Sequence, residues 1–292
     1  MRRPFSIITV LFASLTLTVL LSGCVEKSNE TAEIRAVVTI LPQKEMVEAV
    51  GGDKVVVTVM IPPNQSPHTY APTPSQMVEV SKADVYFMVG SGIEFETARM
   101  DQIKAQNPKM KVVNCSAGIK LMETVGPEGA TKDPHVWLSP RNAKVMVQNI
   151  YDALVELDPQ DAEYFKQNLQ EYTSRLDALD RELRQLFEGK ANQSFLVYHA
   201  AWAYFARDYG LREMVIEEGG KKPGPAGVAK IVEQAKRNGI HVVFVSPQFD
   251  QSSAKVIARE IGGRVVAVDP LAENYIENLR SVANSLAEGL GT

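Results

Sequence analysis

The sequence is poor in cysteine and lacks any concentration of positive charge. Cys24 and Cys115 are the two cysteines among 292 residues, and the net charge is -4. The absence of a basic cluster argues against a nucleic-acid partner. With Cys24 in the N-terminal segment, Cys115 has no partner for an intramolecular disulfide, so the fold must depend on its hydrophobic core. We interpret Cys115 as a buried, inert thiol at the end of a strand.

The N-terminal segment indicates export. Basic residues at positions 2 and 3 precede an apolar run of 15 residues, Ile7 to Leu21. Such a run is short for a membrane span and typical of a signal peptide. The next residues, Leu21-Ser22-Gly23-Cys24, resemble a lipobox. We assign residues 1–24 to a lipoprotein signal peptide with Cys24 as the lipidation site, and residues 25–32 to a flexible tether. An uncleaved membrane anchor is the alternative, and both place the chain on the outer face of the cytoplasmic membrane, on its extracellular or periplasmic side.

The rest of the chain predicts an α/β fold. Short β-branched runs alternate with helical segments in residues 33–157 and again in residues 189–292. This alternation favours mostly parallel sheets with helices on both faces. We therefore expect two Rossmann-like lobes. Residues 158–188 lie between them.

The segment between the lobes predicts one long, rigid helix. Asp158-Pro159 is a good helix start. Apolar residues then recur at alternating spacings of four and three, which is a helical stripe. They are Phe165, Leu169, Tyr172, Leu176, Leu179, Leu183 and Leu186. We expect this helix to lie across both lobes, and the alternative is the seam of a coiled-coil dimer.

The four histidines are the candidates for metal binding or catalysis. No HExxH or CxxC spacing is present, so their spacing alone is a weak signal. His68, His135 and His199 each follow or end a predicted strand, as does Asp269. Ligands of open α/β sheets bind beyond the carboxyl ends of the strands. His241 begins its strand instead, so we interpret it as structural or exposed to solvent. Three imidazoles and one carboxylate would suit tetrahedral Zn²⁺, although each histidine taken alone has an ordinary structural explanation.

Four stretches of sequence resemble the metal-binding solute-binding proteins of ABC importers, the cluster A-I group that includes the zinc-uptake ZnuA type. They are Pro67-His68-Thr69-Tyr70, residues 133–140 (DPHVWLSP), residues 199–205 (HAAWAYF) and Val268-Asp269-Pro270-Leu271. The resemblance implies two α/β lobes joined by one long helix. It also implies that His68, His135, His199 and Asp269 bind a metal ion as cargo. The partners would be an ABC permease and its ATPase, with the carrier monomeric and held at the membrane by its lipid.

The sequence departs from the family pattern at two places. Many zinc-binding members carry a loop rich in histidine and acidic residues before the second ligand histidine, whereas residues 122–132 contain no histidine. Near Pro223, where members usually show an acidic residue and Pro-Ser, the sequence reads Lys-Lys-Pro-Gly-Pro. The first departure removes a metal-trapping role from that loop. The second means that the sequence does not predict the local details of the surface that docks with the permease.

Histidine at position 199, where manganese members usually have glutamate, favours Zn(II) over Mn(II) or Fe(II) as the cargo. We expect loaded and empty forms to differ mainly around His199 and Asp269. The other functions that fit the sequence are a zinc-dependent hydrolase, in which Asp269 would act as a base, an adhesin, and a binding protein for a large chelate. The expectation is a carrier and not an enzyme.

Overall fold

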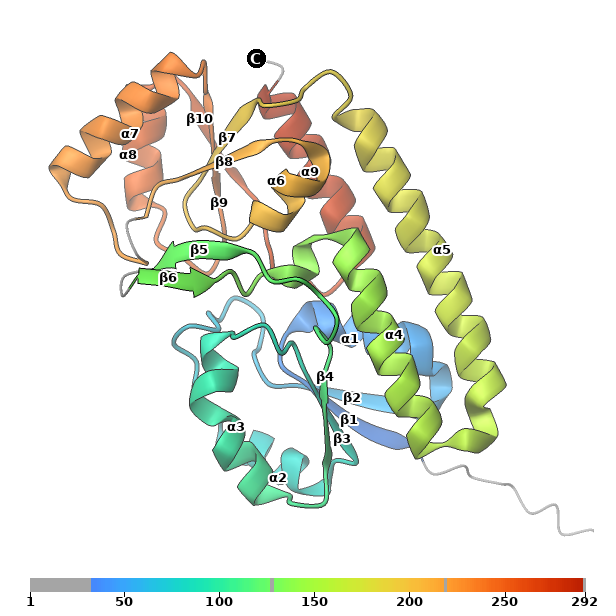
Figure 1. Cartoon of the computed structure of the whole chain (residues 1–292). Helices are drawn as coiled ribbons and strands as arrows, with labels where there is room; N and C mark the ends of the chain where they lie inside the picture. Colours follow the sequence, from blue (N-terminus) through green and yellow to red (C-terminus); the bar gives the residue numbers. More distant parts are fainter. Residues whose placement is uncertain (1–32, 127–128, 218–219, 291–292) are drawn as a thin grey trace, which may run out of the picture. The chain divides into compact units, whose positions relative to one another are not determined.

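The computed structural model describes residues 33–126, 129–217 and 220–290 (Figure 1). The predicted signal peptide, its lipidation site Cys24 and the tether lie outside these residues. Within the described part of the chain, no helix combines the length and apolar character that a bilayer crossing requires.

The first lobe is built on a parallel four-stranded sheet in the order β2-β1-β3-β4. In Figure 1, α2 and α3 lie on one side of this sheet and α1 and α4 on the other. The lobe contains β1 (Ile34–Val38), α1 (Leu41–Gly51), η1 (Gly52–Lys54), β2 (Val55–Val59), α2 (Pro74–Lys82), β3 (Val85–Met88), α3 (Glu94–Gln106), β4 (Lys111–Asn114), β5 (Glu123–Gly126), β6 (Gly129–Lys132), η2 (Val136–Leu138) and α4 (Pro140–Leu157).

The second lobe has a parallel sheet in the order β10-β9-β7-β8. In both lobes the strands lie in the order second, first, third, fourth, numbered along the chain within each lobe. The lobe contains β7 (Ser194–Val197), α6 (Ala203–Tyr209), β8 (Arg212–Val215), α7 (Pro225–Arg237), β9 (Val242–Val245), α8 (Ser252–Glu260), β10 (Arg264–Ala267) and α9 (Tyr275–Leu290). The prediction of two α/β lobes with parallel sheets is confirmed.

Helix α5 (Ala162–Leu186) joins the lobes and follows a 3₁₀ turn, η3 (Pro159–Asp161). At the standard rise its 25 residues span roughly 37 Å. It packs against α1 and α4 of the first lobe and against α9 of the second (Figure 1). Five members of the predicted stripe are fully buried within the chain, Phe165, Tyr172, Leu176, Leu179 and Leu183. The stripe is therefore an intramolecular seam, and the coiled-coil alternative is wrong.

Hydrophobic packing is continuous between the lobes. One cluster of buried side chains runs from the first sheet through α5 to one face of the second sheet, where Phe195 and Val197 belong to it. The neighbouring residues Leu196 and Tyr198 point to the other face and belong to a second cluster, with Ile257. This alternation is the period of two that a strand imposes. One face of the second sheet thus shares its core with the first lobe.

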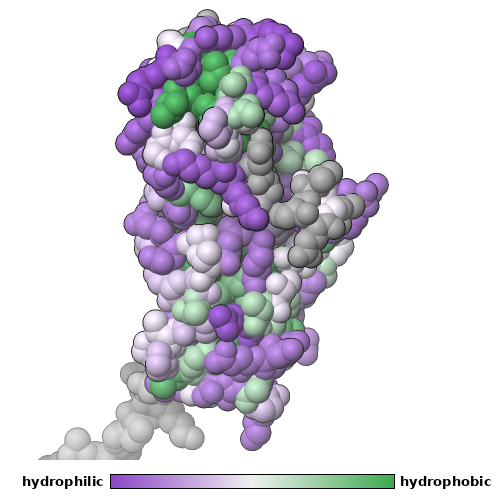
Figure 2. All heavy atoms as spheres, turned by 90° about the vertical axis from the view of Figure 1, so that its left-hand side faces the viewer, coloured by the Kyte–Doolittle hydropathy of each residue, from purple (hydrophilic) through white to green (hydrophobic). Residues whose placement is uncertain are grey.

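The surface near α7 and α8 is largely polar. Figure 2 shows this side of the molecule as mostly hydrophilic, with an apolar patch in its upper part. An open groove between the two helices is lined by Val228, Val232 and Val256, together with charged residues at its margin. Val256 is 41% exposed, so this edge of the second lobe carries uncovered apolar surface.

The antiparallel hairpin β5–β6 was not predicted. It lies within residues 122–132, the segment that contains no histidine. The sequence Gly-Pro-Glu-Gly at 126–129, flanked by Thr-Val and Ala-Thr, is the signal that would have indicated it.

Candidate metal centre

His68 is carried by the loop between β2 and α2. The loop is tied internally, because the backbone amides of Thr69 and Tyr70 both donate to the carbonyl oxygen of Ser66. Gln76, in the first turn of α2, accepts from the Tyr70 hydroxyl at 2.9 Å and donates to the carbonyl oxygen of Met60 at 2.6 Å. His68 thus stands on a well-anchored loop, although its side chain remains 26% exposed.

His135 precedes the 3₁₀ turn η2, which leads into α4. Asp133 Oδ1 accepts from the backbone amide of His135 at 2.8 Å, a local turn that aspartate favours. The neighbouring carbonyl oxygens are also fixed: Ser91 donates to Pro134 at 2.5 Å and Tyr204 to Asp133 at 2.9 Å. Since Tyr204 belongs to the second lobe, it connects that lobe to the loop holding His135.

His199 lies two residues beyond β7, at the carboxyl end of a central strand. The following turn is held by a buried carboxylate, because Glu213 Oε1 accepts from the backbone amides of Ala201 at 3.1 Å and Trp202 at 2.9 Å. Burial raises the pKa of Glu213 to about 7. His199 is therefore fixed by the sheet itself and by the turn that follows it.

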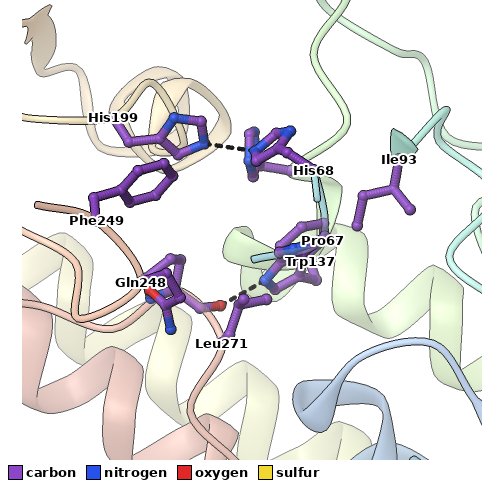
Figure 3. Close-up of a pocket in the computed structure, with 10 residues that line it drawn as sticks. Pro67, His68, Ile93, Trp137, His199, Gln248, Phe249 and Leu271 are labelled. Atoms are coloured by element: carbon purple, nitrogen blue, oxygen red, sulfur yellow. Dashed lines mark hydrogen bonds between the residues drawn. The ribbon is translucent and has the colours of Figure 1, made fainter. Parts of the chain in front are cut away.

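The three histidines meet in one pocket, as the sequence predicted for them. One ring nitrogen from each of His68, His135 and His199 lies within 4.8 Å of the others, a distance that a shared metal ion can bridge. His68 Nε2 lies 3.2 Å from His199 Nε2 (Figure 3). The ring centroids of His135 and His199 are 5.2 Å apart.

Each of these rings has a carboxylate on its Nδ1. The distances are 2.8 Å from His68 to Glu94, 2.9 Å from His135 to Asp133 and 2.7 Å from His199 to Glu217. A carboxylate can only accept, so each Nδ1 donates to it, and in a neutral imidazole the lone pair then lies on Nε2. Facing lone pairs repel, and a shared cation turns that repulsion into coordination. The arrangement is that of carboxylate–histidine–metal triads.

The acidic partners set the charge of the site. Three carboxylates bring three negative charges near the pocket, more than the +2 of a divalent ion. Asp133 and Glu217 are buried, with 7% of each side chain exposed, whereas Glu94 is 53% exposed. Solvent screens the charge of Glu94 more strongly than the other two.

The pKa values of the His199 pair follow from its surroundings. Burial lowers the pKa of His199, the nearby rings of His135 and His68 lower it further, and Glu217 opposes the shift. Burial works to raise the pKa of Glu217, but the hydrogen bond and charge of His199 outweigh it, and the net shift is downward. The pair is thus poised with a neutral imidazole and an ionised carboxylate, the forms that metal binding requires.

Apolar side chains close the pocket. Phe249 stacks on His199, with ring centroids 4.4 Å apart, and Trp137 lies beside His135 at 5.3 Å (Figure 3). Ile93 and Leu271 complete the wall. The free volume is about 10 Å³, close to that of a single water-sized sphere. This free space suits a single ion.

Asp269 lies after β10, next to a residue of the histidine pocket. It follows β10 as expected, but the group of ligand atoms within 4.8 Å of one another contains the three histidines and not Asp269. Its Oδ1 accepts from Gln248 Nε2 at 2.8 Å and from the backbone amide of Leu271 at 2.9 Å. Gln248 itself lines the histidine pocket. Metal binding by Asp269 therefore stays a prediction.

Two further predictions concern residues outside the site. His241 is exposed at the start of β9, with Nδ1 3.3 Å from the carbonyl oxygen of Ile261, which confirms its predicted placement. Cys115 is fully buried, as predicted, and burial raises the pKa of its thiol. Its sulfur accepts from Gln43 at 3.7 Å.

Sequence reasoning did not identify the carboxylates that hold the rings, nor Gln248 and Phe249. Asp133 could have been found, because aspartate two residues before a histidine can form a local turn with it. Glu94 and Glu217 reach their rings only through the tertiary fold. The Gln248–Phe249 pair follows β9 at its carboxyl end, which was the placement rule applied to the histidines.

Comparison with known proteins gives a consistent result. The family model described as "ZnuA: Zinc-uptake complex component A periplasmic" matches residues 36–289. The high-affinity zinc uptake system protein ZnuA of Bacillus subtilis is 28% identical over 252 residues, covering 82% of this chain and 79% of that protein. The iron-binding protein YfeA of Yersinia pestis is 29% identical over 308 residues, covering 100% and 98%.

Solved structures agree with this. A crystal structure of ZnuA superposes with a TM-score of 0.84 at 37% identity, covering 88% of this chain and 99% of that one. The share of the chain that is covered is large enough to include both lobes.

Proposed function

Because the chain belongs to the ZnuA family of periplasmic zinc-uptake components, we propose that it captures Zn(II) between its two lobes and delivers it to an ABC permease. The observation that carries this proposal is the convergence of three imidazole nitrogens on one ion-sized pocket, each ring held by a carboxylate. We place the metal on His68, His135 and His199, with Asp269 or a neighbouring group in the fourth position. Membership of a solute-binding family argues for a carrier over the hydrolase alternative.

Zinc is the favoured cargo because the ligand set is rich in imidazole. Three histidines suit Zn(II), whereas a second carboxylate ligand would suit Mn(II) or Fe(II). The named relatives include both a zinc-uptake protein and an iron-binding protein, so the relatives alone do not separate the metals. The ordering of divalent-metal affinities also favours zinc over manganese and iron at most nitrogen-rich sites.

The carrier would work outside the cytoplasm with a permease and its ATPase. Attachment through lipid on Cys24 would hold a monomeric carrier at the outer face of the cytoplasmic membrane, within reach of the permease. Cleavage before this residue is the processing expected of the lipobox, Leu21-Ser22-Gly23-Cys24. Metabolic labelling with a fatty acid, lost in Cys24→Ala, would test the anchor.

Division of the ligands between the lobes offers a route to release. His68 and His135 belong to the first lobe and His199 to the second, so a small relative movement breaks the site from one side. Hydrogen bonds between the lobes limit that movement: Trp137 Nε1 donates to the carbonyl oxygen of Pro270 at 2.8 Å, and Tyr275 donates to that of Trp137 at 2.6 Å. We therefore expect release by local displacement and not by wide opening.

The metal content of the purified protein tests the function. Protein from defined medium should carry zinc at one ion per chain and prefer it in competition with Mn(II). His135→Ala should lose this binding, while His241→Ala, a histidine on the exposed start of β9, should retain it. His199→Glu should shift the preference towards Mn(II). Equal binding by wild type and His135→Ala would refute the proposal. A preference of the wild type for Mn(II) would show that manganese, and not zinc, is the cargo.

A further inference from the structure

The loop between β9 and α8 places an amide beside the metal pocket. Gln248 lines the pocket with the three histidines (Figure 3). Its Nε2 donates to Asp269 Oδ1 at 2.8 Å. The orientation of this amide follows from its partner. A carboxylate oxygen can only accept, so the nitrogen must face Asp269 and the carbonyl oxygen Oε1 must face another way.

Oε1 of Gln248 is a buried acceptor without a hydrogen-bond partner in the part of the chain that the structure describes. A buried carbonyl oxygen normally has one, because leaving it unsatisfied is unfavourable. The three Nε2 atoms of the pocket are also acceptors, since their rings donate through Nδ1. Gln248 thus brings an unpartnered buried acceptor to the same pocket that the three histidines line.

Charge and space favour a neutral oxygen in the fourth position. The carboxylates of Glu94, Asp133 and Glu217 already exceed the charge of a divalent ion. The pocket is small, with a free volume of about 10 Å³, so an ion placed there lies against the lining side chains, Gln248 among them. Asp269, in contrast, has one oxygen occupied by two donors, Gln248 and the amide of Leu271.

Resting on the zinc-capture function proposed above, we propose that Gln248 supplies the fourth acceptor of the metal centre through Oε1, and that Asp269 is the positioning residue that holds the Gln248 amide in place. The site would then bind a borderline divalent cation with three imidazole nitrogens and one neutral carbonyl oxygen. A neutral fourth ligand also leaves less charge to separate on release than a carboxylate would.

Zinc affinity of matched variants, measured by competition with a chromophoric chelator, tests this assignment. Gln248→Leu keeps the size of the side chain and removes both polar groups, and it should weaken zinc binding by about tenfold or more. The control is Gln65→Leu, an exposed glutamine in the loop of His68, which should leave the affinity unchanged. Asp269→Asn keeps an acceptor for Gln248, so it should cost less than Gln248→Leu.

X-ray absorption of the zinc-loaded protein gives a second readout. The wild type and Asp269→Asn should show four nitrogen or oxygen neighbours with the same edge shape, and Gln248→Leu should alter the edge. Unchanged or tighter zinc binding in Gln248→Leu would overturn the assignment, and so would a larger loss in Asp269→Asn, because Asp269 would then be the ligand.

His135→Ala separates this inference from the proposed function. If His135→Ala binds zinc normally, the histidine site itself is wrong. If His135→Ala loses zinc while Gln248→Leu binds like the wild type, the site stands and only the role of Gln248 falls. Circular dichroism of each metal-free variant checks that the fold is retained.

Discussion

The two lobes share a sheet topology but deliver their ligands differently. In the first lobe, His68 and His135 stand on loops that extend well beyond the strands, and His68 and its partner Glu94 are partly exposed. In the second lobe, His199 lies two residues after a central strand and pairs with the buried Glu217. The sheet order is the same in both lobes, but His199 is fixed beside a strand, whereas His68 stands on a loop and is partly exposed to solvent.

This difference bears on how the ion enters and leaves. Loop-borne, exposed His68 is the ligand that can move without disturbing a sheet, whereas His199 is held by β7 and by the turn that Glu213 caps. The exposure of the side chains therefore favours movement at His68. The sequence-based expectation placed the change at His199 and Asp269, and a pair of crystal structures with and without zinc would decide between them.

The largest expected effects come from the cores. Leu176→Ala in the shared cluster and Ile257→Ala in the second-lobe cluster should each lower the free energy of unfolding by about 2–5 kcal/mol, because both side chains are fully buried. They should differ in where hydrogen exchange increases. Leu176→Ala should increase exchange in both lobes, and Ile257→Ala mainly in α7, α8 and their sheet. Identical exchange maps would show that the lobes do not differ in this way.

Replacing the carboxylates that contact the rings should distinguish the buried ligand His199 from the exposed ligand His68. Glu217→Gln should weaken zinc binding by roughly 10–100-fold, as removal of a buried metal-supporting carboxylate does. Glu94→Gln should have a smaller effect, because Glu94 is 53% exposed and screened by solvent. Titration at low and high salt should show that only the Glu94 contribution depends strongly on ionic strength. Equal losses in the two variants would contradict the contrast between the ligands.

The turn behind His199 should make folding stability depend on pH. Burial raises the pKa of Glu213 from 4.5 to about 7, so the folded protein holds a proton that the unfolded chain releases. Stability from this group is highest below about pH 4.5 and falls as the pH rises towards 7. Glu213→Gln should remove the loss and stabilise the metal-free protein at pH 8 by on the order of 1–3 kcal/mol.

Denaturant unfolding at pH 5 and pH 8 measures this effect. Glu213→Ala is the matched control, because it removes the charge together with the acceptor for the amides of Ala201 and Trp202, and it should destabilise at both pH values. If Glu213→Gln has the same free energy of unfolding as the wild type at both pH values, the carboxylate is not the cause of the pH dependence.

Zinc affinity should fall in acid, because protons compete for the imidazole nitrogens. Histidines with ordinary pKa values lose their neutral form below about pH 6.5. Since burial lowers the pKa of His199, this ligand should stay available to a lower pH than an exposed histidine. Affinity measured from pH 5 to 8 should be constant near neutrality and decrease below it, and a flat profile would exclude histidine ligands.

The smallest effect should come from an ion pair between the lobes at the surface. Lys44 of α1 pairs with Glu273, near the start of α9. Both side chains are partly exposed, so Lys44→Ala should change the free energy of unfolding by no more than about 1 kcal/mol. Zinc affinity should not change. A marked effect on either would mean that surface pairs, and not the shared core, hold the lobes together.

The periodicity of apolar residues predicted most of the fold. The alternation of strand-like and helical segments predicted the two lobes with parallel sheets, and the apolar stripe predicted the long helix between them. The three histidines were found because strand ends gather at one edge of a sheet. The sequence could not show that Glu94 and Glu217 reach those rings, since these contacts depend on how helices and loops pack. It also gave no sign that Gln248 would stand between Asp269 and the pocket.

The shared core has a consequence for whichever membrane protein receives the ion. One apolar cluster runs through α5 from the first lobe to the second, so we expect the outline of the carrier to change little when the cargo leaves. The membrane protein would then be unable to distinguish loaded from empty carriers by their overall shape. It would have to detect small side-chain movements near the metal pocket, and empty carriers would compete with loaded ones for the same docking site.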